Sequence, residues 1–127
     1  MLTQEDEPCR ISQRFYNLPE NIAEDTCVLD LEGELDLYSS RKIQEFFDSI
    51  IQKGYQKICV DLSKVRYIDS SGLGIFLRNH TYLAKSGGYI RLIAPSKEVN
   101  VILELTKLHK LLLKFDSVEK AIKRVVF

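Results

Sequence analysis

The chain is organised around ten residues, Tyr67-Ile68-Asp69-Ser70-Ser71-Gly72-Leu73-Gly74-Ile75-Phe76. Upstream, residues 57–62 form a short apolar run rich in β-branched residues, typical of a central strand covered on both faces. Downstream, apolar residues recur every three or four positions and predict a helix. Its predicted inward face consists of Leu73, Phe76, Leu77, His80, Leu83 and Ala84. Gly87-Gly88 ends this helix before a second strand at residues 89–93, so the unit is βαβ with parallel strands.

The start of this helix carries residues that a purely structural turn does not need. Asp69, Ser70 and Ser71 are all good N-cap types. Gly72 and Gly74 follow within the first turn, where each costs up to about 1 kcal/mol relative to alanine. The two glycines leave the turn bare, so another backbone or a partner can approach it closely. The positive end of the helix dipole also makes this turn a natural seat for an anion.

Length and composition predict one soluble domain. The 127 residues are 45% hydrophobic and 28% charged, and 18 basic residues balance 18 acidic ones. This balance lacks the basic excess of nucleic-acid-binding proteins. No apolar stretch approaches the length that spans a bilayer, and the acidic residues 1–7 lack a signal peptide's apolar core. We therefore expect a single cytoplasmic domain over residues 1–127, with a flexible tail at about 1–9, that contacts neither nucleic acid nor membrane.

The remaining elements are predicted from the same periodicities. We expect an edge strand near 10–15, a strand from 27 that Gly33 ends, and a helix that Ser39 or Ser40 caps and Gly54 stops. Further on we expect a helix over about 95–105, a strand at 111–115 and a last helix from Asp116. The predicted fold class is a small α/β domain with a mixed, mostly parallel sheet and packed helices. The three cysteines lack Cys-x-x-Cys spacing and are interpreted as small buried hydrophobic residues.

Two motifs give the sequence a family resemblance. Asp69-Ser70-Ser71-Gly72-Leu73-Gly74 after an apolar strand resembles the signature of the STAS domain, in particular that of bacterial anti-sigma factor antagonists. Gly33-Glu34-Leu35-Asp36 matches a second family motif beside the phosphorylation site. Residues 103–108 occupy the place of a Ser/Thr-Gly-Leu turn, with Lys107 where that glycine would be. The resemblance covers roughly residues 27–122.

This resemblance implies a switch protein that catalyses no reaction and needs no cofactor or metal. In the family, a partner kinase phosphorylates the serine directly after the aspartate, which is Ser70 here. The unphosphorylated form binds an anti-sigma factor that is itself a serine kinase and so frees the sigma factor. A metal-dependent serine phosphatase resets the switch. We expect the partner-binding surface to comprise Asp36, Asp69, Ser71, Gly72, Gly74, Ile75 and Arg78. Ile75 and Arg78 are included because they fall off the predicted inward stripe and should be exposed.

Other interpretations of these residues remain open. Ser70 could be an unmodified N-cap, and Ser71 is a competing phosphate acceptor. Asp36 and Asp69 could cap helices, or hold Mg²⁺ weakly as only two ligands. The chain lacks a Gly-x-Ser-x-Gly elbow and a phosphate-binding glycine loop, which argues against a hydrolase and a nucleotide-binding domain. The alternative functions are a STAS scaffold or transport-complex subunit, and a domain that senses a small anion or nucleotide.

Overall fold

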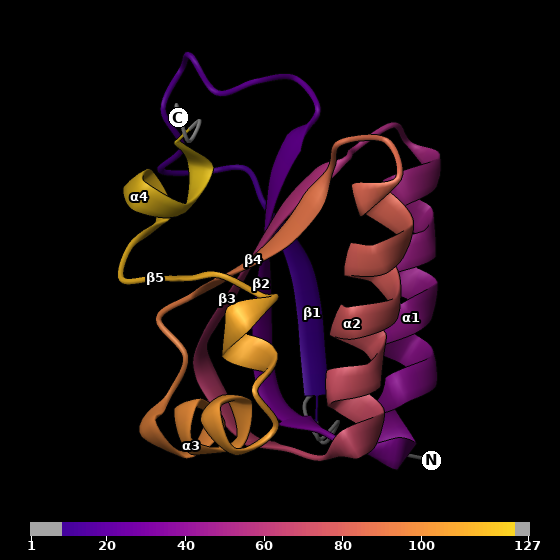
Figure 1. The fold of residues 1–127 in the computed structure, drawn as a ribbon. Helices are drawn as coiled ribbons and strands as arrows, with labels where there is room; N and C mark the ends of the chain where they lie inside the picture. Colours follow the sequence, from indigo (N-terminus) through magenta and orange to yellow (C-terminus); the bar gives the residue numbers. More distant parts are fainter. Residues whose placement is uncertain (1–8, 124–127) are drawn as a thin grey trace.

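Five strands form one mixed sheet in the order β1-β2-β3-β4-β5 in the computed structural model, which describes residues 9–123 (Figure 1). The strands are β1 (Cys9–Arg14), β2 (Thr26–Leu35), β3 (Lys57–Ile68), β4 (Tyr89–Ile93) and β5 (Lys114–Phe115). The helices are α1 (Leu37–Gln52), α2 (Ser70–Ala84), α3 (Lys97–Leu105), the 3-10 turn η2 (Leu108–Lys110) and α4 (Val118–Ile122). β1 pairs antiparallel with β2, and the other neighbours pair parallel. The α/β fold class and the predicted βαβ unit are confirmed.

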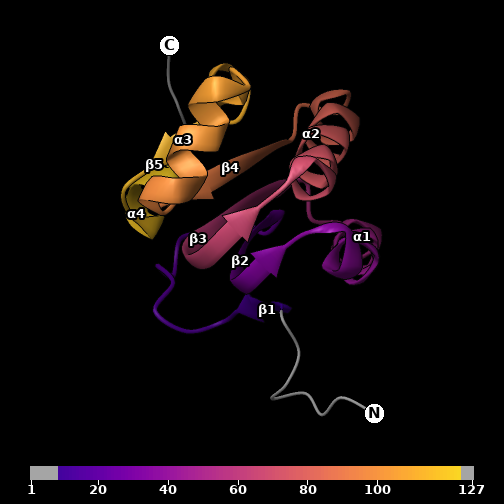
Figure 2. The same ribbon diagram turned by 90° about the horizontal axis from the view of Figure 1, so that it is seen from below.

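The two faces of the sheet are covered unequally. α1 and α2 lie side by side on one face, where they pack on alternate residues of the strands, such as Leu29 and Val60 (Figure 2). α4 lies on the opposite face, over a smaller apolar cluster that includes Val28 and Cys59. The strands alternate in this way because successive side chains point to opposite faces. All three cysteines are buried and unoxidised, as expected.

The ends of several strands differ from the predicted ones. β2 passes through Gly33, which has φ 105° and lies beside a shift in the β2–β3 register, so Gly33 shapes a bulge and does not end the strand. β3 runs six residues past its predicted end to Ile68. The predicted last strand shrinks to two residues because η2 forms just before it. The predicted tail overlaps β1 at the buried Cys9, and its other residues lie outside the described part of the chain.

Lys107 adopts the backbone conformation that the family's glycine would supply. Its φ and ψ are 62° and 14°, in the left-handed region, and it connects α3 to η2. A non-glycine residue pays roughly 1–2 kcal/mol to enter this region. The turn therefore forms without the glycine.

None of the helices in residues 9–123 combines the length and apolar character that crossing a bilayer requires.

Candidate functional site

The ends of β2 and β3 bring the two predicted motifs together. Leu35 pairs with Ile68 at the end of the parallel ladder, so Asp36 and Asp69 follow at equivalent positions on neighbouring strands. The amide of Asp69 also donates a hydrogen bond to the carbonyl of Leu35 at 3.0 Å, which ties the two turns to each other. α1 and α2 start from these turns and run side by side (Figure 1). The expected juxtaposition of the Gly-Glu-Leu-Asp and Asp-Ser-Ser-Gly motifs is confirmed.

Asp36 caps α1, so the prediction that Ser39 or Ser40 does so is wrong. Its Oδ1 accepts hydrogen bonds from the amides of Tyr38 and Ser39, each at 3.0 Å. The buried Ser39 completes a capping box, because its hydroxyl oxygen accepts from the Asp36 amide at 3.0 Å and donates to the Glu34 carbonyl at 2.8 Å. The cap lies three residues earlier than expected because the strand ends directly into the helix.

Asp69 caps α2, and its carboxylate takes amides of the first turn at which we expected an anion to bind. Its Oδ1 accepts from the amides of Ser71 at 2.8 Å and Gly72 at 3.2 Å. The orphan amides of a first turn are what attracts an anion to a helix N-terminus. Since an internal carboxylate already takes two of them, the turn is a poor site for a free small anion. The alternative in which Asp69 caps the helix is confirmed, and its carboxylate competes with any anion for these amides.

Ser70 is the first residue of α2 and is exposed. Within the described residues its hydroxyl makes no hydrogen bond, so no internal role occupies it. Ser71 is half-buried, and its amide, unlike its hydroxyl, serves the cap. Of the two candidate acceptors, Ser70 presents the more accessible hydroxyl.

The two glycines of the first turn differ in what surrounds them. A Cβ on Gly72 would lie 2.7 Å from the Leu35 carbonyl oxygen and 2.9 Å from a side-chain carbon of Ile68. Gly72 therefore lets α2 pack tightly against the ends of β2 and β3. A Cβ on Gly74 would meet nothing within 4 Å. No internal contact requires glycine at position 74, and its bare backbone faces open space.

The predicted exposure of Ile75 is wrong. Its side chain is 1% exposed and belongs to the main core, whereas Leu77, predicted to face inward, is 36% exposed. Ala84 is exposed as well. The buried face of α2 is rotated from the predicted one because α2 packs against α1 in addition to the sheet. Asn79 and Gln44 exchange two amide hydrogen bonds across that interface.

Arg78 is exposed, as predicted, but lies further along α2, in a groove between α1 and α2 that it lines with Asp48 and Tyr82. Among residues 9–123 it forms no ion pair. Arg78 thus belongs to the exposed surface of α2, two turns from Ser70. The site that the fold assembles directly consists of Asp36, Asp69, Ser70, Ser71, Gly72 and Gly74.

Three exposed apolar side chains beside this site were missed. Leu37 and Tyr38, in the first turn of α1, are 68% and 88% exposed, and Tyr67, near the end of β3, is 50% exposed. Leu37 and Tyr38 fall off the stripe that contains Ile43 and Phe47, and this offset was a usable signal. Clustered exposed aromatic and aliphatic side chains mark interaction surfaces more often than single ones do.

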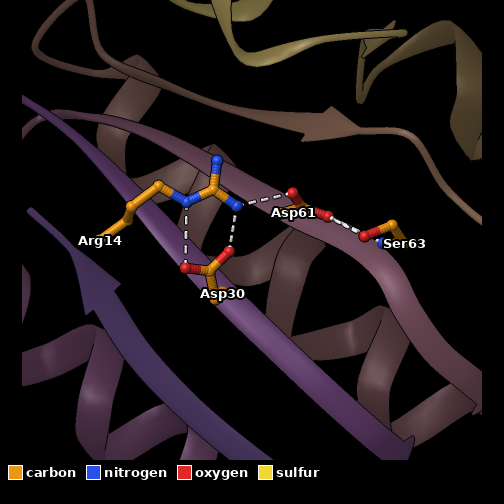
Figure 3. A network of polar contacts seen from close by, with 4 residues as sticks. All are labelled: Arg14, Asp30, Asp61 and Ser63. Atoms are coloured by element: carbon orange, nitrogen blue, oxygen red, sulfur yellow. Dashed lines mark hydrogen bonds and ion pairs between the residues drawn. The ribbon is translucent and has the colours of Figure 1, made fainter. Parts of the chain in front are cut away.

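A polar network joins three strands on the sheet face opposite α1 and α2 (Figure 3). The Arg14 guanidinium donates to both carboxylate oxygens of Asp30 and, at 2.8 Å, to Asp61. Ser63 donates its amide and hydroxyl to the other oxygen of Asp61, at 2.9 and 2.7 Å. The network staples the edge strand β1 to β2 and β3. Arg14 lies 16 and 47 positions from its two carboxylate partners, and no sequence pattern signalled these pairs.

The opposite charges of Arg14 and its carboxylate partners stabilise each other's ionised forms. Burial alone would raise the pKa of the Asp61 carboxyl, but hydrogen bonds from Ser63 and Arg14 outweigh burial and leave the pKa below its ordinary value. The hydrogen bond to Asp30 is the main cause that raises the pKa of Arg14. Within residues 9–123 no three potential metal ligands converge, here or at the start of α2. The arrangement holds β1, β2 and β3 together through charged hydrogen bonds.

The comparison with known proteins agrees with this geometry. A family model of the STAS domain matches residues 18–121. The chain belongs to the STAS domain family, and the relatives that it matches are described as anti-sigma factor antagonists. One relative, described as "Putative anti-sigma factor antagonist", comes from Thermotoga maritima. It is 32% identical over 108 residues, which is 84% of this chain and 96% of the relative. The anti-sigma-B factor antagonist of Staphylococcus aureus is 31% identical over 63% of this chain and 74% of its own.

Solved structures show the same fold. The crystal structure of the Thermotoga maritima protein superposes with a TM-score of 0.72 at 30% identity, over 84% of this chain and 94% of that one. The anti-sigma factor antagonist SpoIIAA in its unphosphorylated form gives a TM-score of 0.72 at 24% identity, over 89% of this chain and 93% of that one. The sequence-based resemblance to this family is confirmed.

Proposed function

We propose that this chain is an anti-sigma factor antagonist that works as a cytoplasmic partner switch without catalysing a reaction. Its unphosphorylated form binds an anti-sigma factor with serine kinase activity, and phosphorylation of Ser70 ends that binding. A metal-dependent serine phosphatase restores the binding form. The observation that carries the proposal is the setting of Ser70, an exposed hydroxyl with no internal hydrogen bond in the described structure, at the start of α2.

The surroundings of Ser70 suit docking followed by phosphoryl transfer. Gly74 leaves the helix backbone open on one side, and Leu37, Tyr38 and Tyr67 offer exposed apolar surface close by. The kinase brings ATP, and the Ser70 Oγ forms a bond to the γ-phosphorus as the bond to the ADP oxygen breaks. The hydroxyl proton passes to a base of the kinase. The STAS chain is the phosphoryl acceptor, so it needs no base of its own.

The phosphate acts on the complex more than on the fold. A phosphoserine carries about −1.5 to −2 charges at neutral pH. Asp69 already satisfies two amides of the turn, so a phosphate on Ser70 gains little from them. Against a carboxylate of a docked partner, two like unit charges 4 Å apart repel by about 4 kcal/mol at an effective dielectric constant of 20. That repulsion is roughly a thousandfold in affinity.

The alternative of a small-anion or nucleotide sensor is disfavoured because Asp69 occupies the helix N-terminus that would bind the anion. The STAS scaffold alternative shares the docking surface but needs no modification of Ser70. Phosphorylation therefore discriminates between scaffold and switch.

The deciding experiment incubates the chain with ATP and the anti-sigma factor kinase of the same organism, and locates phosphate by mass spectrometry. We expect Ser70→Ala to abolish stoichiometric phosphorylation yet still bind the kinase, and Ser71→Ala, the matched control, to be phosphorylated. Phosphorylated wild-type protein should lose at least 100-fold in affinity and keep its melting temperature within a few degrees. Phosphorylation of Ser70→Ala at Ser71 would move the site, and unchanged affinity after phosphorylation would favour the scaffold.

A further inference from the structure

Arg91, on β4, is a buried arginine without a carboxylate partner in the described structure. Its side chain lies on the face away from α1 and α2, and the residue is 6% exposed. The guanidinium carbon lies 3.9 Å from the ring centroid of Tyr89 and 5.3 Å from that of Phe115. Aromatic faces attract cations in this geometry, but they do not satisfy the guanidinium's hydrogen-bond donors.

The donors of Arg91 go to the end of α4. Its Nη1 donates hydrogen bonds to the carbonyls of Ala121 and Lys123, both at 2.8 Å. These carbonyls belong to the last turn of the helix and the residue after it, where intrahelical partners run out. Hydrogen bonds from a charged donor are roughly twice as strong as neutral ones. Arg91 therefore fastens the C-terminal end of α4 to the sheet.

Within residues 9–123, the other contacts of α4 are few and mostly apolar. It is five residues long, far below the length at which a helix is stable by itself. Ser117 caps its start, and Ala121 is its one fully buried residue in the described range, with Val118 and Ile122 half-buried. Ala121 packs in an apolar cluster with Val28, Cys59 and Ile93 of the sheet, and this cluster is separate from the main core under α1 and α2.

We propose that α4 is a latch, fastened by Arg91, which opens as a local unit while the rest of the domain stays folded. Opening exposes the patch of Val28, Cys59 and Ile93 on the sheet face away from α1 and α2. The patch lies on the sheet face away from α1 and α2, whereas the Ser70 site lies past the carboxyl ends of β2 and β3, so the latch operates independently of the phosphorylation switch. This inference does not depend on the proposed function.

Cys59 reports on the latch, because its Sγ lies 3.5 Å from the Ala121 carbonyl oxygen, directly under α4. Cys27 is a matched internal reference, since it lies on the neighbouring strand but faces the main core. Both thiols are buried, and burial raises the pKa of each to about 12, with the Arg91 charge acting in the opposite direction on Cys59. A difference in their reactivity therefore reports which part of the fold opens.

The first test labels folded wild-type protein with N-ethylmaleimide and follows each cysteine peptide by mass spectrometry. We expect Cys59 to react at least tenfold faster than Cys27. The Cys59 rate should change little in low urea because a local opening exposes little surface, whereas the Cys27 rate should rise steeply as global unfolding does. Equal rates with the same urea dependence would overturn the proposal, since α4 would then open only with the whole domain.

The second test replaces the fastening residue. Arg91→Met keeps an unbranched side chain against the two rings and removes the donors, so the ratio of Cys59 to Cys27 labelling rates should rise at least tenfold over wild type. Lys120→Met is the control, because Lys120 lies on the same helix and its ion pair is with the exposed Asp116. An unchanged ratio in Arg91→Met would show that Arg91 does not hold the latch. If Arg91→Met fails to fold, the wild-type urea series still decides whether α4 opens alone.

Discussion

α1 and α2 begin directly after neighbouring parallel strands, and an aspartate caps each of them, Asp36 for α1 and Asp69 for α2. The residues after the caps differ. α1 continues with Leu37, Tyr38 and the buried Ser39, which locks the turn through a capping box. α2 continues with the exposed Ser70, then Ser71 and Gly72, and its first turn has no reciprocal side-chain bond.

The two turns, which follow the carboxyl ends of β2 and β3, therefore have different properties. The α1 turn is closed by a capping box and presents apolar side chains, whereas the α2 turn contains glycines and presents the Ser70 hydroxyl. A docking partner can gain affinity from the first and reach a modifiable group on the second. Substitutions at matched positions in the two turns should therefore change different properties, stability or binding.

The largest effect is expected at Gly72. Gly72→Ala forces a methyl group into the Leu35 carbonyl and Ile68, and overpacking of this kind costs about 1–3 kcal/mol of unfolding free energy. Gly74→Ala adds a methyl group in open space and should stabilise the free domain by up to about 1 kcal/mol. Urea denaturation measures both. Equal effects of the two substitutions would show that the first turn of α2 is not packed as described.

Tyr38 should matter for binding and not for folding. Because Tyr38 is 88% exposed, Tyr38→Ser should change unfolding free energy by less than about 0.5 kcal/mol. Exposed aromatic side chains at interfaces are frequent hot spots, so the variant should lose at least about tenfold in affinity for the anti-sigma factor. Tyr82→Ser, on the exposed surface near the end of α2, is the control and should bind normally. Titration calorimetry with all three proteins distinguishes them.

Ser39 and Ser70 show the same contrast on a smaller scale. Ser39→Ala leaves the Glu34 carbonyl and the Asp36 amide without their partner and should cost about 1 kcal/mol of stability. Ser70→Ala should cost less than about 0.5 kcal/mol because Asp69 caps the helix in its place. Thermal unfolding of both variants measures the difference. A large loss in Ser70→Ala would mean that Ser70 contributes to the cap.

The smallest effect is expected at His80, which joins the middle of α2 to β4. The Nδ1 of His80 accepts a hydrogen bond from the Ile90 amide at 3.0 Å, which requires that nitrogen to be unprotonated. Burial lowers the pKa of His80 below 6.5, so the unfolded chain takes up the proton first as pH falls. This contribution to stability is complete above about pH 6.5 and is lost as pH drops through the lower folded-state pKa.

The measurement is the melting temperature of wild type and His80→Gln between pH 7.5 and 5. The wild type should lose melting temperature over this range, and the variant should lose less because it has no proton to take up there. Parallel curves for the two proteins would show that His80 does not tie α2 to β4 in a pH-dependent way.

The sequence by itself determined the order of strands and helices, the parallel βαβ unit and the family. Strands 57–62 and 89–93 are apolar runs, and the helix between them is long enough to require a crossover, so local pattern sufficed. The family resemblance implied that Asp36 lies beside Asp69, and the parallel pairing of β2 and β3 in the structure produces this placement. Ser70 stood out because it directly follows an aspartate that can cap, within a glycine-containing turn.

Only the tertiary structure decided which side chains of these elements face outward. Ile75 is buried and Leu77 exposed because α2 packs on α1 as well as on the sheet, and a helix with two neighbours buries a face that its own periodicity does not centre. The same holds for the two glycines, since contacts with Leu35 and Ile68 distinguish Gly72 from Gly74. The Arg14 network and the Arg91 bonds to α4 join residues from 16 to 47 positions apart, and a sequence pattern carries no record of such pairs. Packing between elements settles these features because each depends on a neighbour that the local sequence does not contain.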